Sequence, residues 1–189
     1  MTSSSPTGER PDLEALLVRT LPAVEGYLRL RMGPLLRAKE SAADLVQSVA
    51  RGALAALAGF DYRGEGAFRQ WLFERARHKL QEHVRHFQQA CRDARREVAH
   101  DAAPDSVLPA YRTLGTPSQE LSSAEAIAAI ERAFDQLPEE WQEAVTLHRL
   151  AGLSHAQIAA HMQKSEGAVR NLVYRGLSRL AIALDRTTG

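Results

Sequence analysis

The chain has 189 residues, a formal net charge of +1 and a single cysteine, Cys91, which excludes an internal disulfide. No apolar run approaches the roughly 20 residues that a membrane span needs. The start, MTSSSPTGERPD, lacks an apolar signal-peptide segment, so we expect a cytoplasmic protein without membrane insertion. Val, Ile and Thr runs of period two are absent, whereas Ala, Leu, Arg, Glu and Gln dominate. The composition therefore predicts an all-α fold.

Three helical patterns follow a polar start, residues 1–10, which we expect to be disordered. Apolar residues recur at helical spacing from Leu13 to near Gly33-Pro34, then from about Ser41, and again from Phe68 to Phe87 after the glycine-containing loop FDYRGEG (60–66). Helices of this length can form one bundle, which we assign to residues 11–97.

The third helical pattern is strongly basic. Between Arg69 and Arg96 it has eight Lys or Arg residues against three acidic ones. Such a stripe favours contact with a phosphate backbone, although a solvated helix face is the common explanation of a charge run.

The pattern fails over residues 98–119. This segment, which includes AHDAAPDSVLPAYRTLGTPS, has three prolines, a glycine and small polar residues, and is predicted to be a flexible linker. Helical periodicity returns at Ala124, so we assign residues 120–187 to a second small helical domain.

The last 50 or so residues predict two helices joined by a tight turn. Gly152 ends a helix that begins near Pro138, Ser154 and Gln157 have the spacing of a capping box, and Ser165 can cap the final helix. The final helix places Glu166, Arg170, Asn171, Tyr174 and Arg175 outward. Arg suits guanine and Asn suits adenine when a helix lies in the major groove, so the pattern favours a DNA-binding helix-turn-helix. An ordinary helical hairpin with a solvated face is the alternative.

Four segments in this order resemble the extracytoplasmic-function class of bacterial RNA polymerase sigma factors. They are ESAADLVQ (40–47), FDYRGEGAFRQWLFERARHKLQEHVR (60–85), LPEEWQEAVTLHRLAGLSHAQIAAHM (137–162) and SEGAVRNLVYRGL (165–177). The resemblance implies a sigma region 2-like bundle and a sigma region 4-like helix-turn-helix. It also implies a transcription initiation factor that binds core RNA polymerase and promoter DNA, with an anti-sigma factor as a further partner.

The resemblance also implies roles for particular residues. It implies that Asp44, Gln47, Ser48 and Arg51 bind the β′ coiled coil of the polymerase. The C-terminal domain is expected to contact the β flap. By the same resemblance, the residues that bind unpaired bases of the minus-ten element are Tyr62, Arg63, Gly64, Glu65, Arg69, Arg77 and His78. Those that bind the minus-thirty-five duplex are Ser165, Glu166, Arg170, Asn171, Tyr174 and Arg175.

The chain departs from the family pattern in three places. Two acidic groups are missing before Asp44, and Ser41 would restore negative charge if phosphorylated, the alternative being an ordinary N-cap. Gln163 and Lys164 replace a glycine and an aliphatic residue in the helix-turn-helix, which predicts a differently shaped turn because a left-handed non-glycine residue costs roughly 1 kcal/mol. His78 replaces an Asn, which would change base preference.

Two other functions are compatible with parts of this pattern. A helix-turn-helix regulator with an N-terminal sensing or dimerisation bundle is the main alternative, and a protein that binds only another protein is a third. The sequence has no phosphate-binding glycine loop, nucleophile elbow or convincing carboxylate pair, so we expect no enzyme activity and no cofactor. His78, His83, His86 and Cys91 are close in sequence, but only one pair has ligand spacing, so no metal site is expected.

Overall fold

The computed structural model describes residues 12–90, 104–115 and 122–186. Over these ranges the chain is helical and contains no strand, which confirms the all-α prediction. The elements are α1 (Leu13–Arg37), α2 (Ala42–Leu57), α3 (Glu65–Ala90), a short 3₁₀ turn η1 (Asp105–Val107), α4 (Leu108–Tyr111), α5 (Ser123–Asp135), α6 (Glu139–Arg149), α7 (His155–Met162) and α8 (Glu166–Asp185). None of these helices combines the length and apolarity needed to cross a membrane.

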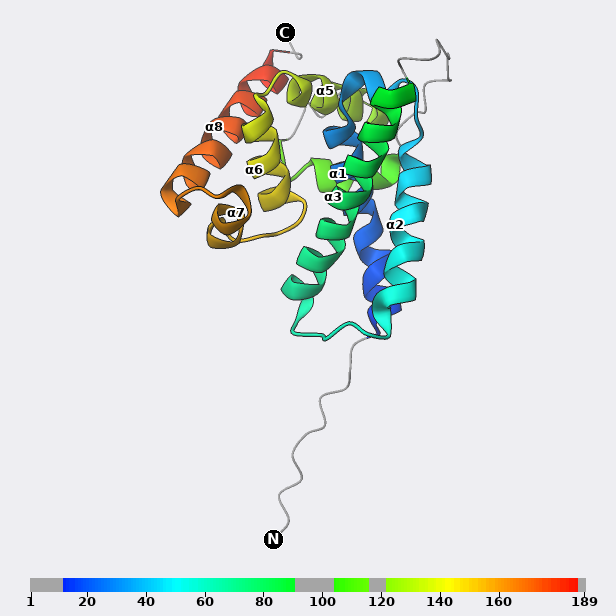
Figure 1. Ribbon diagram of the computed structural model, residues 1–189. Helices are drawn as coiled ribbons and strands as arrows, with labels where there is room; N and C mark the ends of the chain where they lie inside the picture. Colours follow the sequence, from blue (N-terminus) through cyan, green and yellow to red (C-terminus); the bar gives the residue numbers. More distant parts are fainter. Residues whose placement is uncertain (1–11, 91–103, 116–121, 187–189) are drawn as a thin grey trace.

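Helices α1, α2 and α3 pack on one another as the N-terminal bundle (Figure 1). Asp12 caps α1 by accepting from the backbone N–H groups of Glu14 and Ala15. The predicted end of this helix near Gly33 is a kink, where Gly33 has φ 71, and helix continues beyond it to Arg37. Ser41 is the N-cap of α2, with no side-chain capping hydrogen bond.

Helices α5 to α8 form the C-terminal domain, in which α8 packs on α5, α6 and α7. The predicted capping box of α7 is present, since Ser154 accepts from the Gln157 N–H and Gln157 accepts from the Ser154 N–H. Ser165 caps α8 by accepting from the Ala168 N–H. Gln163 adopts the left-handed conformation, with φ 54, so the turn keeps the conformation that glycine favours despite the side chain.

The segment 98–119, predicted to be a flexible linker, contains helical turns in its described part, 104–115. The structure has η1 and α4 there, both packed against α1 and α5. Val107 and Tyr111 are fully buried, and Leu108 and Leu114 are also buried. The prolines concealed an apolar spacing of three or four residues, which lets this short segment fill the space between the two domains.

A buried group of charges joins the two domains beside α4. We call Arg29, Arg37, Tyr111, Glu131 and Asp135 the junction cluster. Arg29 Nε lies 2.8 Å from Glu131 Oε1, and the Tyr111 hydroxyl donates to the same oxygen at 3.0 Å. Arg37 binds both Glu131 and Asp135. These contacts fix α1 against α5, so the two domains form one closed particle.

The ionisation of the junction cluster follows from its burial. Burial opposes the charge on Arg29, but the hydrogen bond and charge of Glu131 outweigh it and raise the pKa of the guanidinium. Burial also raises the pKa of Tyr111, helped by Glu131. Burial raises the pKa of Asp135 despite the nearby Arg37. Tyr111 therefore stays a neutral donor at any physiological pH.

Candidate nucleic-acid and polymerase interfaces

The N-terminal half of α8 presents a continuous exposed face. Ser165, Glu166, Arg170, Asn171, Tyr174 and Arg175 are all exposed, as predicted for an outward surface. Val169, Val173 and Gly176 alternate with them and are buried against the domain. Arg170 forms an exposed ion pair with Glu166 at 3.1 Å, which contributes little stability and leaves the guanidinium free to exchange partners.

This face depends on a close contact between α8 and α6. A Cβ built on Gly176 would lie 2.5 Å from Val145 Cγ2, so only glycine allows the two helices to approach so closely.

Two histidines stack between α6 and α7. His155, the first residue of α7, stacks on His148 with ring centroids 4.6 Å apart. Partial burial and the neighbouring His148 and Arg170 lower the pKa of His155, so it is neutral near pH 7.

The loop before α3 carries the first part of the predicted minus-ten set. Arg63 is exposed and pairs with Asp61 at 2.8 Å, and Gly64 has φ 105, a conformation that favours glycine. Tyr62 is half-buried and packs against the core, which leaves only part of its ring available for stacking. Glu65 opens α3 and pairs with Arg19.

Helix α3 carries the rest of that set, on two different faces. His78 is exposed and borders a surface hollow of about 530 Å³, which is lined by Ala67, Gln70, Trp71, Glu74, Arg75 and His78. The Arg75 guanidinium lies 4.6 Å from the centre of the Trp71 ring. An aromatic face beside a cation suits a nucleobase, so the hollow brings His78 together with residues that sequence reasoning did not assign to DNA.

Those residues could have been found from their spacing. Positions 67, 70, 71, 74, 75 and 78 share one face of a helix, and four of the six are polar or charged. Trp71 packs on Phe60 and Phe68 in the core while remaining half-exposed at the hollow. Sequence periodicity could not reveal this double role.

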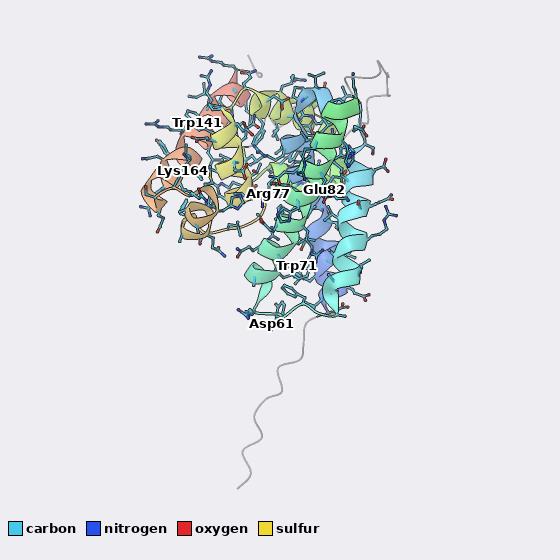
Figure 2. The ribbon with its side chains drawn as sticks, viewed as in Figure 1. Asp61, Trp71, Arg77, Glu82, Trp141 and Lys164 are labelled. Carbon is cyan, nitrogen blue, oxygen red and sulfur yellow. The ribbon has the colours of Figure 1, made fainter. Side chains whose placement is uncertain are left out.

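Arg69 and Arg77 point instead toward the C-terminal domain. Arg69 donates to the backbone oxygens of Leu150 and Ala151, at 2.6 and 3.3 Å. Arg77 donates through two nitrogens to Glu74, whose hydrogen bond raises the Arg77 pKa despite partial burial. Figure 2 places Arg77 between α3 and the C-terminal helices, with Trp71 nearer the loop that holds Asp61. In the closed particle Arg69 is therefore held by the C-terminal domain, whereas Arg77 is paired within α3 itself.

The outer side of α2 is the last candidate surface. Asp44, Gln47, Ser48 and Arg51 share one face of the helix, and all but the half-buried Ser48 are exposed. Leu45 and Val49 are buried on the opposite face against the bundle. The structure thus gathers the predicted polymerase-binding residues on a surface that can meet another helix.

Among the described residues, no group of three or more His, Cys, Asp or Glu side chains could hold a metal ion. His83 pairs with Glu40 at 3.4 Å rather than with another histidine. Cys91 lies outside the described residues.

Both halves of the chain match models of known protein families. The family model for Sigma-70 region 2 matches residues 16–91, and the model for Sigma-70, region 4 matches residues 127–180. The ECF RNA polymerase sigma factor SigD of Mycobacterium tuberculosis is 30% identical over 175 residues, covering 92% of this chain and 77% of that protein. The ECF RNA polymerase sigma-E factor of Escherichia coli K12 is 32% identical over 133 residues, covering 70% and 68%.

A solved structure has the same fold. It is the sigma factor RpoE of Bartonella quintana in complex with the anti-sigma factor NepR. The match has a TM-score of 0.62 at 22% sequence identity, and it covers 93% of this chain and 98% of that one.

Proposed function

The chain belongs to the extracytoplasmic-function class of RNA polymerase sigma factors, and from that premise we propose which of its surfaces performs each part of the work. A protein of this class binds core RNA polymerase and directs promoter recognition, melting and transcription initiation. We assign the minus-thirty-five duplex to the exposed face of α8, the unpaired minus-ten strand to the loop 59–64 with α3, and the β′ coiled coil to α2. The C-terminal domain would contact the β flap.

The observation that carries this assignment is the exposed face of α8. Two arginines, an asparagine and a tyrosine stand together on one side of a helix whose other side is buried, directly after a tight left-handed turn. A helix held in this way can enter the major groove with its first turns against base edges. The same observation disfavours a protein that binds only another protein.

Duplex binding tests the α8 assignment. For Arg170→Ala and Arg175→Ala, we expect weaker promoter binding and, where the arginine contacts a phosphate, a salt dependence whose slope falls by about 0.9. Arg186→Ala is the matched control, because it removes the same charge from an exposed position at the far end of α8. Equal losses in all three variants would mean that only general charge matters.

Transcription with purified core polymerase tests the whole assignment. Run-off products from a genomic promoter library identify the promoters that the protein directs. On those promoters, Arg63→Ala and His78→Ala should reduce strand opening, measured by permanganate reactivity, more than duplex binding. Promoter binding that falls in parallel with opening would remove these residues from the minus-ten surface.

Polymerase binding tests the α2 assignment. Asp44→Ala and Gln47→Ala should weaken binding to core polymerase without reducing binding of isolated duplex. Because Ser41 occupies the N-cap position of α2, a phosphate there would add charge at the helix start, and Ser41→Glu compared with Ser41→Ala measures that effect. Equal polymerase binding by both variants would exclude such a switch.

We also propose cytoplasmic action and control by an anti-sigma factor. The fold shared with a sigma factor solved in such a complex supports the second point. An anti-sigma factor that blocks both DNA surfaces would have to bind α3 and α8 together, because they lie on different domains. Protection of both surfaces from hydrogen exchange in the complex would test this.

A further inference from the structure

We propose that the carboxyl-terminal end of α6 substitutes for a DNA phosphate and holds Arg69 away from the promoter while the two domains are closed. The proposal rests on the proposed function, because it takes Arg69 to be a minus-ten contact. It assigns the α6–α7 turn, Leu150–Gly152, a regulatory role in addition to its place in the helix-turn-helix.

The chemistry of the contact is that of an anion site. The last carbonyls of a helix have no intrahelical donor, and the helix dipole places partial negative charge at this end. Arg69 donates through two of its nitrogens to the carbonyl of Leu150, the C-cap of α6, at 2.6 Å and to that of Ala151, the next residue, at 3.3 Å, much as a guanidinium binds two oxygens of one phosphate. A strand of DNA would therefore compete with this turn for the same guanidinium.

Adjacent residues fit the turn closely onto α3. Gly152 has φ 72, which bends the chain back at this point, and a Cβ there would lie 3.4 Å from Arg69 Nε. Beside it, Gln157 on α7 donates to Gln70 on α3 at 2.8 Å. Gln70 also lines the hollow beside Trp71, so the turn reaches the rim of the surface assigned to unpaired bases.

Promoter geometry requires this contact to break. The names of the two elements place them roughly 25 base pairs apart, which is about 85 Å of duplex at 3.4 Å per pair. A compact chain of this length has a radius of gyration of about 16 Å and cannot reach both elements at once. Engagement of both elements must therefore move α6 away from α3 and release Arg69.

Substitution of Arg31 should separate the two domains without altering either surface assigned to DNA. It lies on α1 at the edge of the junction, where it binds Glu143 on α6 at 2.7 Å and approaches Glu139 at 3.9 Å. Arg31→Glu brings like charges together there, and the double variant Arg31→Glu, Glu143→Arg restores an opposite pair. The two variants differ in whether residues 31 and 143 repel or attract each other across the domains.

The test measures binding of a fluorescein-labelled single-stranded DNA 15-mer of mixed sequence over a range of salt concentrations, with X-ray scattering to follow domain opening. Arg31→Glu should enlarge the particle and bind the strand more tightly, and the salt slope should steepen by about 0.7, the value of one added phosphate contact. The gain would run against electrostatics, because this variant is two charges less positive. The double variant should return to wild-type binding.

Arg69→Gln in the Arg31→Glu background identifies the cation responsible, and it should remove the added slope. An opened particle whose strand binding does not rise would overturn the proposal while leaving the minus-ten assignment standing. An unchanged slope after Arg69→Gln, together with normal promoter opening by Arg69→Gln holoenzyme, would overturn both the proposal and the role of Arg69.

A second route avoids dependence on the folding of Arg31→Glu. In a Cys91→Ser background, Gln70→Cys and Gln157→Cys can be joined by a short cleavable cross-linker, because the native side chains are in contact. The cross-linked protein should bind the strand more weakly than the same protein after cleavage. Equal binding before and after cleavage would contradict the proposal.

Discussion

The two surfaces assigned to DNA differ in what already occupies them. On α8, Arg170 and Arg175 are exposed, and Arg170 pairs with the neighbouring Glu166. On α3, Arg69 is held by backbone oxygens of the other domain and Arg77 by Glu74. The α8 arginines are therefore accessible in the closed particle, whereas release of Arg69, though not of Arg77, depends on the position of the C-terminal domain. The order of events at a promoter can follow from this difference, with upstream contact before melting.

The largest expected effect comes from the junction cluster. Glu131→Ala leaves Arg29 and Arg37 buried without their shared carboxylate, and breaking a buried ion pair in this way costs about 3–5 kcal/mol. We expect that loss in the free energy of unfolding measured with urea, or separation of the domains seen as a larger radius of gyration. In the separated form α3 would become as accessible as α8.

Glu140→Gln provides the control for Glu131→Ala. Glu140 is largely exposed and pairs with Lys164 at 2.9 Å, so its loss should cost less than about 1 kcal/mol. If Glu131→Ala proves as mild as Glu140→Gln, the junction cluster does not hold the closed state.

The next largest effect is expected from Gly176→Ala, which disturbs the packing of the C-terminal domain behind the α8 surface and the turn that contacts α3. Gly176→Ala places a methyl group 2.5 Å from Val145 Cγ2, and overpacking of this kind costs about 1–3 kcal/mol even after the gain in helix propensity. Because α6 must shift, both α8 and the turn that holds Arg69 are disturbed. Thermal unfolding measures the loss, and Gly167→Ala, which meets no atom within 4 Å, should show none.

A smaller effect is expected from a substitution in the turn before α8, which should leave the α3 surface unchanged. Gln163→Gly removes the side chain from a left-handed residue, which should raise the free energy of unfolding by about 1 kcal/mol. The position is exposed at the end of α7 and belongs to neither α3 nor the junction cluster, so strand binding by α3 should not change. Destabilisation in urea would show that the Gln163 side chain makes a compensating contact.

Local features of this fold could be read from the sequence, and the junction could not. The caps at Ser154 and Ser165 depend on residues three positions away, so periodicity and spacing predict them. Arg29 and Glu131 are 102 residues apart, and each appears in an ordinary amphipathic helix. The partners of Arg69 are backbone oxygens, which no side-chain pattern encodes. Thus the surface on α8 was predictable, but the occupancy of α3 was not.

The smallest expected effect is the pH dependence of closure through Glu143. Burial favours its protonated form, but the hydrogen bond from His161 and the charges of Arg31, His161 and Arg77 outweigh burial and lower its pKa below the usual 4.5. A carboxylate whose folded-state pKa is lowered stabilises the fold above its unfolded pKa and loses that contribution as the pH falls through the folded value. The closed state should therefore weaken below about pH 4.5.

Glu143→Gln isolates this contribution from other carboxylates at the junction. Asp135 acts in the opposite sense, because burial raises its pKa and acid protonates it with a gain in stability, and that behaviour is retained in the variant. Urea unfolding between pH 7 and pH 3.5 should show a shallower acid loss for Glu143→Gln than for wild type. An identical pH dependence would mean that Arg31 and His161 do not hold α6 through Glu143, and acid would then give no selective access to the α3 surface.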